Sequence, residues 1–419
     1  MKKQYLILLL AATQMKICFA QVTPNYCGSP RFDTEVYSGV TITSNISYGS
    51  NINYAGNNIN LTMDIYQPTG DPASIRPLII WVHGGSFVFG TKNDADVTSL
   101  CNHFAKRGYV CASINYRLGI PIPPSQETAT KAVYRAVQDL KAAVRYFRKN
   151  AATTNSYKVD PEMIFAGGSS AGAFTALHLA YLDQPSELPA YIDTMELGGL
   201  EGNSGNPGYS SHVNAIVNLC GALGDTAWMK PGDIPVCSMH GTSDPVVPYA
   251  TAMLSLGGFQ IMVVNGSYSV NQYANAIGVQ NAMYTFYGGD HVPFASNTSY
   301  MDTTVRFVSN FLYAYMGCAP ADPNPLPNTF VTTAIPEISA LEDEITVYPN
   351  PAVDHFTIQL NNSSAQKLVL TDVTGRMIRT IQLNAEIPAT VDKGSLSAGM
   401  YFLKIYVSGK IITKKICFQ

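Results

Sequence analysis

The sequence predicts an α/β protein with a mostly parallel sheet flanked by helices, followed by a small all-β domain. Short apolar runs alternate with helical segments over the first three quarters of the chain, which is typical of a buried parallel sheet. After a proline-rich stretch, residues 344–419 form short runs of alternating polarity, which indicate antiparallel strands. The six apolar runs are residues 78–82, 109–115, 163–166, 213–219, 236–239 and 283–287.

Residues 1–20 have the pattern of a signal peptide. Met1 is followed by two lysines, an apolar stretch at 5–13 and a small residue, Ala20, at the expected cleavage position. The stretch is too short to span a membrane, and no later run of ~20 apolar residues appears. We therefore expect an exported, soluble mature protein without a membrane span.

Four further segments have local patterns that matter below. Residues 40–66 alternate as antiparallel strands do, and residues 128–150 carry the longest helical stripe. A helix is also expected directly after Pro248. Residues 183–211 lack periodicity and are rich in Gly, Pro and Tyr, so they form either a substrate-binding insertion or lid, or a plain loop.

The most informative motif is Gly168-Ser169-Ser170-Ala171-Gly172, which lies between an apolar run and a helical segment. G-x-S-x-G at a strand-to-helix turn is a nucleophile elbow, in which glycines allow a sharp turn that exposes the serine hydroxyl. Only Ser170 fits this frame, because a motif centred on Ser169 would need glycine at position 171. Ser170 is therefore the candidate nucleophile.

A serine nucleophile needs a base, and the base needs an acid that orients it. In elbow-type enzymes these follow in the order acid, then histidine. Asp244 comes after the apolar run 236–239, and His291 comes after the run 283–287 and two glycines. Their order and strand-end positions predict a Ser170–His291–Asp244 triad.

Other residues could fill these roles or have structural ones. Asp290 could replace Asp244 as the acid, although neighbouring side chains on an extended loop diverge. Asp244 could also be an ordinary turn residue before Pro245. His240 is interpreted as shaping the Asp244 loop, and His178 as packing on the helix that follows the elbow.

Residues 77–87 read as a buried strand that ends in His83-Gly84-Gly85-Ser86, and the turn is similar to the HGGG-type turn that supplies an oxyanion hole. Backbone N–H groups perform that role, so serine in place of the last glycine is compatible with it. The predicted donors are the N–H groups of Gly85, Ser86 and Ala171. A plain strand-end turn is the alternative.

Seven cysteines remain after removal of residues 1–20, and their spacing matches neither a zinc ribbon nor a C-x-x-C site. In an exported protein disulfides are expected. Cys27 and Cys318 could tie the ends of the first region together, and a Cys101–Cys111 pair is also sterically plausible. The full connectivity is left open, with one cysteine unpaired.

The predicted division of the chain is a signal peptide at 1–20, a first domain at 21–317, a proline-rich linker at 318–343 and a β-sandwich at 344–419. Charge excludes one class of partner. The net charge is −3 with 13% charged residues, and no basic stripe appears, so a nucleic-acid partner is not expected.

The motifs HGGSFVFGTK, GGSSAGA and HGTSDPVVPY resemble the α/β-hydrolase superfamily, in its carboxylesterase, hormone-sensitive-lipase-like and feruloyl/acetylxylan-esterase-like branches. The resemblance implies an α/β-hydrolase fold and hydrolysis of carboxylic esters through an acyl-enzyme without a cofactor. The motifs VYPNPA, LTDVTGR and GMYFLKI resemble the C-terminal sorting domain of the type IX secretion system of Bacteroidetes. That resemblance implies the secretion machinery as a partner and a secreted or cell-surface location. An ordinary carbohydrate-binding or adhesion sandwich is the alternative reading of the tail.

We therefore expect a secreted serine esterase that acts on a small-molecule or polymer-borne ester. The alternatives are an esterase for plant-wall esters or polyesters, a serine peptidase, and a non-catalytic adhesion protein. The acyl and alcohol specificity, the oligomeric state and cleavage of the tail are left open. Four residues near the expected site could line an acyl pocket or belong to the core: Phe87, Phe89, Trp228 and Met229.

Overall fold

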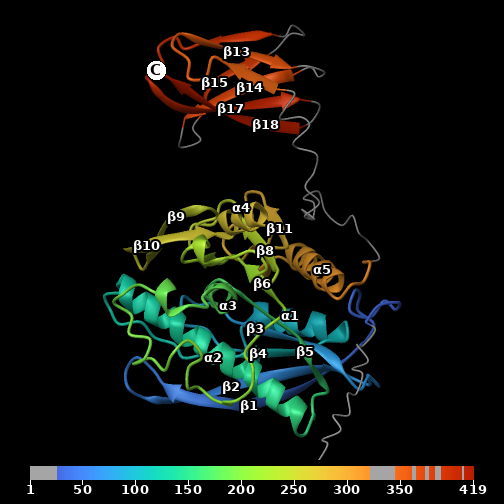
Figure 1. Cartoon of the computed structure of the whole chain (residues 1–419). Helices are drawn as coiled ribbons and strands as arrows, with labels where there is room; N and C mark the ends of the chain where they lie inside the picture. The colour runs from blue at the N-terminus through green and yellow to red at the C-terminus, as the bar shows by residue number, and fades with distance from the viewer. Residues whose placement is uncertain (1–25, 321–344, 361–364, 373–376, 383–387, 408–409) are drawn as a thin grey trace, which may run out of the picture. The chain divides into compact units, whose positions relative to one another are not determined.

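The computed structural model describes residues 26–320, 345–360, 365–372, 377–382, 388–407 and 410–419 (Figure 1). The chain forms two compact units, Met1–Thr332 and Thr333–Gln419, each described by itself below. The predicted signal peptide, most of the predicted linker and the 373–376 turn lie outside the described residues. Within these residues, no helix combines the length and apolar character needed to cross a membrane.

The first unit is built on an eight-stranded sheet in the order β1-β2-β4-β3-β5-β6-β8-β11 (Figure 1). Strands β4, β3, β5, β6, β8 and β11 are parallel to one another, whereas β1 and β2 join antiparallel at one edge. The bounds are β1 Val40–Ile52, β2 Asn58–Pro68, β3 Arg76–Val82, β4 Val110–Ile114, β5 Val159–Ser169, β6 Ala215–Leu219, β8 Val236–Gly241 and β11 Asn281–Phe286. The α/β fold class is confirmed.

Helices cover both faces of this sheet, and the central strand β3 shows why its sequence is apolar throughout. All seven of its residues are buried. Leu78, Ile80 and Val82 pack in one core cluster with α2, α3 and α4, whereas Ile79 and Trp81 pack in a second cluster with α1 and α5. Because successive side chains of a strand alternate between faces, a sheet covered on both faces needs apolar residues at every position. The helices are α1 Ala95–Lys106, α2 Gln126–Ala152, α3 Ala171–Tyr181, α4 Ser267–Ile277 and α5 Thr298–Tyr315.

The expectation of a helix directly after Pro248 is wrong. The chain there forms an antiparallel hairpin of β9 (Thr251–Leu256) and β10 (Phe259–Gly266), which pairs with β7 (Ala222–Leu223), and α4 begins only afterwards. Gly257 and Gly258 form the turn with φ of 58° and 86°. Positive φ at two successive glycines is the signature of a tight hairpin turn, and the Gly-Gly pair is its signal in the sequence.

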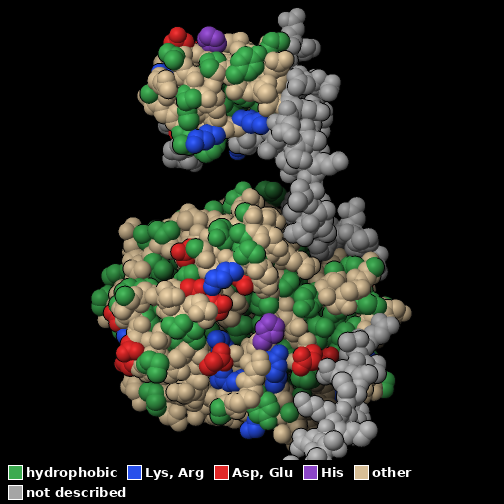
Figure 2. Space-filling view, in the orientation of Figure 1, with side chains coloured by type: hydrophobic (Ala, Val, Ile, Leu, Met, Phe, Trp, Pro, Cys, Tyr) green, Lys and Arg blue, Asp and Glu red, His purple; other side chains and the backbone are tan. Residues whose placement is uncertain are grey.

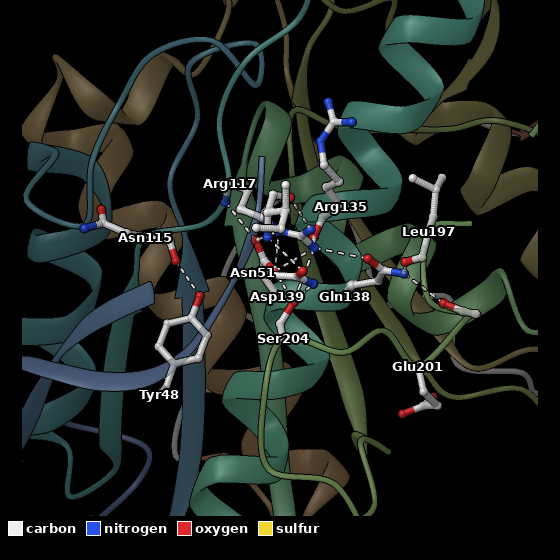
Figure 3. A network of polar contacts seen from close by, with 12 residues as sticks. Tyr48, Asn51, Asn115, Arg117, Arg135, Gln138, Asp139, Leu197, Glu201 and Ser204 are labelled. Carbon is white, nitrogen blue, oxygen red and sulfur yellow. Dashed lines mark hydrogen bonds and ion pairs between the residues drawn. The ribbon is translucent and has the colours of Figure 1, made fainter. Parts of the chain in front are cut away.

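The segment at residues 183–211 is fastened to helix α2 by a buried polar network (Figure 3). The Oδ1 atom of Asp139 accepts hydrogen bonds from Arg117 Nε at 2.9 Å and Ser204 Oγ at 2.6 Å. Gln138 Nε2 donates to the carbonyls of Leu197 and Gly199. The segment also contains the 3-10 helix η1 (Pro185–Glu187). These contacts make it a fixed part of the unit, with its polar anchors on the residues of α2.

Of the two disulfide pairings that the sequence suggests, one is present. Cys27 and Cys318 form a disulfide that joins the two ends of the described part of the first unit. The Cys101–Cys111 pairing is wrong, because both residues are free thiols buried in the core on α1 and β4. Burial raises the pKa of both thiols well above the ordinary value, so they behave as small apolar residues.

The second unit consists of two antiparallel sheets, with strand orders β12-β13-β16 and β15-β14-β17-β18. Side chains of both sheets share one apolar core, which includes Phe356 and Ile358 from the first sheet and Leu403 and Ile405 from the second. This is the arrangement of a β-sandwich. The strands are β12 Ile345–Tyr348, β13 His355–Leu360, β14 Ala365–Asp372, β15 Met377–Gln382, β16 Ala389–Asp392, β17 Gly399–Val407 and β18 Lys410–Phe418.

Candidate active site

Ser170 occupies the sharp turn between β5 and α3. Its backbone has φ 52° and ψ −119°, and its N–H donates to the carbonyl of Leu219 at 2.9 Å. The flanking glycines are required by close approach of the backbone: a Cβ at Gly172 would lie 1.9 Å from the carbonyl oxygen of Val82, and one at Gly168 would lie 2.5 Å from it. The motif therefore forms a strained elbow that presents the Ser170 hydroxyl at the end of the parallel strands.

The structure brings Ser170, His291 and Asp244 together in one hydrogen-bonded chain. Ser170 Oγ lies 2.8 Å from Nε2 of His291, and the Nδ1 of the same ring lies 2.7 Å from Oδ2 of Asp244. Asp244 follows β8 and His291 follows β11, which are neighbouring parallel strands. Parallel strands end at the same edge of the sheet, and this explains how residues so far apart in sequence meet.

The Asp244 carboxylate is fully engaged. Oδ1 accepts hydrogen bonds from the backbone N–H groups of Val246 and Val247. Oδ2 accepts hydrogen bonds from Nδ1 of His291 and, at 3.0 Å, from Nε2 of His240. Burial alone would raise the pKa of this carboxyl. The hydrogen bonds from His240, His291 and Val247 outweigh it and hold the pKa well below its ordinary value, so Asp244 is ionised.

A second histidine, His240, is hydrogen-bonded to Asp244. It is completely buried, and its Nε2 also lies 3.2 Å from the carbonyl oxygen of Val247. Since both neighbours of Nε2 are acceptors, Nε2 carries the proton. Nδ1 lies 2.7 Å from Ser267 Oγ, which itself accepts a hydrogen bond from Asn218 Nδ2. The sequence reasoning placed His240 in a loop-shaping role; the direct bond to Asp244 was missed, and its signal was the His-x-x-x-Asp spacing after a strand.

The turn after β3 lies directly beside the elbow. Gly85 has φ +105°, and a Cβ there would lie 2.3 Å from the carbonyl oxygen of Phe89; Ser86 has φ 55°. Ser86, Ser170 and Ala171 line one cavity together. Among the described residues, no acceptor is found for the N–H groups of Gly85, Ser86 and Ala171. Three unpaired donors beside a serine hydroxyl are what an oxyanion site needs.

The rival residues lie elsewhere in the site. The Asp290 carboxylate accepts a hydrogen bond from the backbone N–H of His291, whereas the ring of His291 is bonded to Asp244. The Ser169 hydroxyl donates a hydrogen bond to Asp96. Cys220, His240 and Asp244 offer three possible metal-ligand atoms within 4.8 Å of one another. However, His240 and Asp244 are hydrogen-bonded to each other. Burial also raises the pKa of the Cys220 thiol to about 12, so this thiol is protonated. These groups therefore serve to hold Asp244 in place and do not form a good metal site.

A cavity of about 350 Å³ opens beside Ser170, and its walls are mainly apolar. It lies between α2, α3 and the hairpin β9–β10. Phe87 and Trp228 line it, whereas Phe89 is 72% exposed and Met229 is buried in the core. The segment at 183–211 contributes Glu187, Leu188 and Pro189 to its wall. A volume of this size is at the lower end of small-molecule sites.

Charged side chains are intermingled on the face of the first unit that Figure 2 shows, with no continuous basic area among the described residues there. This agrees with the near-neutral charge of the chain.

Two family models match the chain. Residues 63–229 match BD-FAE, and residues 346–419 match the secretion system C-terminal sorting domain. Over residues 63–229 the first unit is therefore similar to the BD-FAE family, and it is homologous to carboxylic ester hydrolases. The match of residues 346–419 to a secretion sorting domain indicates a secreted or cell-surface protein.

Individual relatives match shorter stretches. Carboxylesterase 3B of Mus musculus is 34% identical over 113 residues, which are 27% of this chain and 19% of the mouse protein. Neuroligin-2 of Homo sapiens is 33% identical over 118 residues, 28% of this chain and 13% of the human protein. The solved structure of a truncated form of carbohydrate esterase from gut microbiota superimposes with a TM-score of 0.46 at 20% identity, covering 68% of this chain and 98% of that one. The chain thus spans less than a fifth of the length of either curated relative.

Proposed function

We propose that the first unit hydrolyses carboxylic esters through an acyl-enzyme, with Ser170 as nucleophile, His291 as base and Asp244 as the orienting acid. The observation that carries this proposal is the unbroken hydrogen-bonded chain Ser170–His291–Asp244, with links of 2.8 and 2.7 Å. Relatives include both esterases and a neuroligin, so homology alone does not separate a catalyst from an adhesion protein. The complete chain of reactive groups beside a cavity favours the catalyst.

In the first step, Ser170 Oγ attacks the ester carbonyl while its proton passes to Nε2 of His291. The ionised Asp244 accepts a hydrogen bond from the Nδ1–H of His291 and stabilises the imidazolium that forms. The carbonyl oxygen becomes an oxyanion, which the N–H groups of Gly85, Ser86 and Ala171 hold; each such donor is typically worth ~3 kcal/mol. The imidazolium then protonates the alcohol oxygen, and the alcohol leaves.

In the second step, water attacks the acyl group on Ser170 and transfers a proton to His291. The oxyanion forms again at the same donors, and collapse returns the proton to Ser170 Oγ with release of the acid. No residue beyond the triad and the donors is required for either step. The proposed substrate is a small-molecule or polymer-borne ester whose apolar part fits the cavity beside Ser170.

The experiment is hydrolysis of a panel of nitrophenyl acyl esters, feruloyl esters and acetylated sugars, with a peptide amide in parallel, by wild type, Ser170→Ala and Ser169→Ala. Ser170→Ala should lose ester hydrolysis while its circular dichroism and melting curve stay unchanged. Ser169→Ala is the matched control and should keep most of the activity. More than a tenth of wild-type turnover in Ser170→Ala would overturn the assignment, and cleavage of only the amide would favour a peptidase.

We further propose that the C-terminal unit directs export through the type IX secretion machinery and takes no part in catalysis. A chain that ends at Ala321 keeps Cys318 for its disulfide with Cys27 and should retain ester hydrolysis. In the native host it should accumulate in the periplasm. Normal appearance of this truncated chain outside the cell would contradict the sorting role, and loss of activity in the purified chain would show that the second unit belongs to the working enzyme.

A further inference from the structure

His178 is a buried polar residue in the wall of the cavity that the proposed mechanism does not use. It lies on α3, the helix that begins directly after Ser170, and it lines the cavity together with Phe174 and Trp228. Its side chain is 7% exposed. A polar group in such a place normally has its hydrogen bonds satisfied within the protein.

One ring nitrogen of His178 is satisfied and the other is not. Nδ1 lies 2.8 Å from the carbonyl oxygen of Phe174, so Nδ1 carries the proton and donates a hydrogen bond to that oxygen. Burial lowers the pKa of His178 to about 4, and the ring is therefore neutral at ordinary pH. Nε2 is then a bare lone pair, and no donor for it is found among the residues that the structure describes.

The surroundings keep Nε2 open toward the cavity. The ring stacks on Phe174 with centroids 6.2 Å apart and meets the Trp228 ring edge-on at 5.5 Å. Gly224, also in the cavity wall, faces Nε2; a Cβ there would lie only 3.4 Å from it. A side chain at position 224 would meet the Trp228 ring first, at 2.6 Å, so glycine lets that ring pack beside His178. Nε2 itself is not among the fully enclosed polar atoms of the described residues.

The carboxylates of the same wall are already engaged. Glu187 accepts hydrogen bonds from Nζ of Lys230 and from two backbone N–H groups. Asp225 accepts a hydrogen bond from the backbone N–H of Ala227. Helix geometry puts His178 about 12 Å along the axis of α3 from Ser170, at 1.5 Å per residue. A ligand that is bonded to Ser170 would reach Nε2 only with its far end.

We propose that Nε2 of His178 accepts a hydrogen bond from a hydroxyl at the far end of the acyl group, so that the cavity prefers acyl chains with a terminal hydroxyl. The acyl part is the one concerned because it stays on Ser170 beside the cavity after the alcohol has left. This inference rests on the proposed esterase function. An apolar chain would fill the cavity as well, but it would leave Nε2 without a partner.

The test compares kcat/KM for nitrophenyl esters of plain, ω-hydroxy and ω-methoxy acids with hexanoyl, octanoyl and decanoyl chains. The methoxy ester keeps an oxygen at the same position but has no donor. Wild type should favour the hydroxy over the methoxy ester by about ten-fold at the chain length that reaches His178, as expected for one buried hydrogen bond. In His178→Phe, which has no acceptor, the ratio should fall to about one while the plain ester is still cleaved.

Two further variants keep the test decisive. His178→Gln retains an acceptor and should keep part of the preference for the hydroxy ester. This variant also provides the comparison if the Phe variant does not fold. Met262→Leu changes another cavity residue without a polar group and should leave the ratio unchanged. Equal ratios in wild type and His178→Phe, or no preference in wild type, would overturn this inference alone. Failure of wild type to cleave any ester would overturn the proposed function with it.

Discussion

His240 Nε2 lies 3.0 Å from Oδ2 of Asp244, the same oxygen that accepts the Nδ1–H of His291. The proposed acid is therefore held by a second, fully buried histidine whose own orientation is fixed by Ser267. The hydrogen bond from His240 fixes the position of this carboxylate, and it lowers the pKa of Asp244 together with the other donors.

Replacement of His240 should slow the chemistry without changing substrate binding. His240→Phe removes one hydrogen bond to a charged acceptor, worth roughly 1.5–3 kcal/mol, so kcat should fall about ten- to a hundred-fold while KM stays nearly constant. His240→Gln can keep one donor and should lose less. Steady-state kinetics on one nitrophenyl ester decide the matter. A folded Phe variant with wild-type kcat would show that His240 does not position Asp244.

The pH dependence of stability should show His178 as a buried neutral ring. Its pKa falls from 6.5 to about 4 on folding because of burial. Between these pH values the folded state binds fewer protons than the unfolded state. The contribution of His178 to the free energy of unfolding is therefore complete above pH 6.5 and is lost as the pH falls to 4. The loss should reach up to about 3 kcal/mol.

Urea unfolding of wild type and His178→Phe at several pH values between 4 and 7 measures this contribution. Burial also lowers the pKa values of His83 and His212, so only the difference between the two proteins reports on His178. The wild-type curve should fall more steeply toward pH 4. Parallel curves would contradict a neutral buried His178. The Asp244 contribution is separate, because it is lost only below the ordinary carboxyl range, toward the depressed pKa of that group.

The sequence predicted the parts of this site that follow from strand ends. Ser170, Asp244 and His291 each come after an apolar run, and parallel strands bring such positions to one edge. Contacts between side chains have no comparable signal. The bonds of His240 to Asp244 and of Ser204 to Asp139 depend on how loops and helices pack. The segment after Pro248 is a hairpin and not the predicted helix, because Gly257 and Gly258 form a tight turn there.

The network that anchors the 183–211 segment should contribute strongly to stability (Figure 3). Asp139→Ala leaves the Arg117 guanidinium, 4% exposed, without its ion-pair partner and should cost about 3–5 kcal/mol. Ser204→Ala removes one hydrogen bond to the same carboxylate and should cost less, about 1–2 kcal/mol. Urea unfolding measures both. An Asp139→Ala variant as stable as Ser204→Ala would show that the ion pair does not anchor the segment.

The cysteine assignment predicts a definite number of thiols. The described part of the chain has one disulfide, Cys27–Cys318, and five free cysteines, of which four are buried. A chain that starts at Gln21 should therefore release five thiols to a thiol reagent when it is denatured without reductant, and almost none of the buried four while folded. A count of three would indicate a second disulfide, such as the Cys101–Cys111 pair that the structure excludes.

The most direct test of the central claim is covalent labelling by an organophosphate, followed by peptide mass spectrometry. Phosphylation requires a serine hydroxyl that is activated by a neighbouring base, and in the described part of the chain the Ser170 hydroxyl lies 2.8 Å from the proposed base His291. We predict one label per chain, on Ser170, with loss of ester hydrolysis in proportion to labelling and no label in His291→Ala. A label on Ser169 or another serine, or full labelling without loss of hydrolysis, would contradict the assignment of Ser170 as the nucleophile.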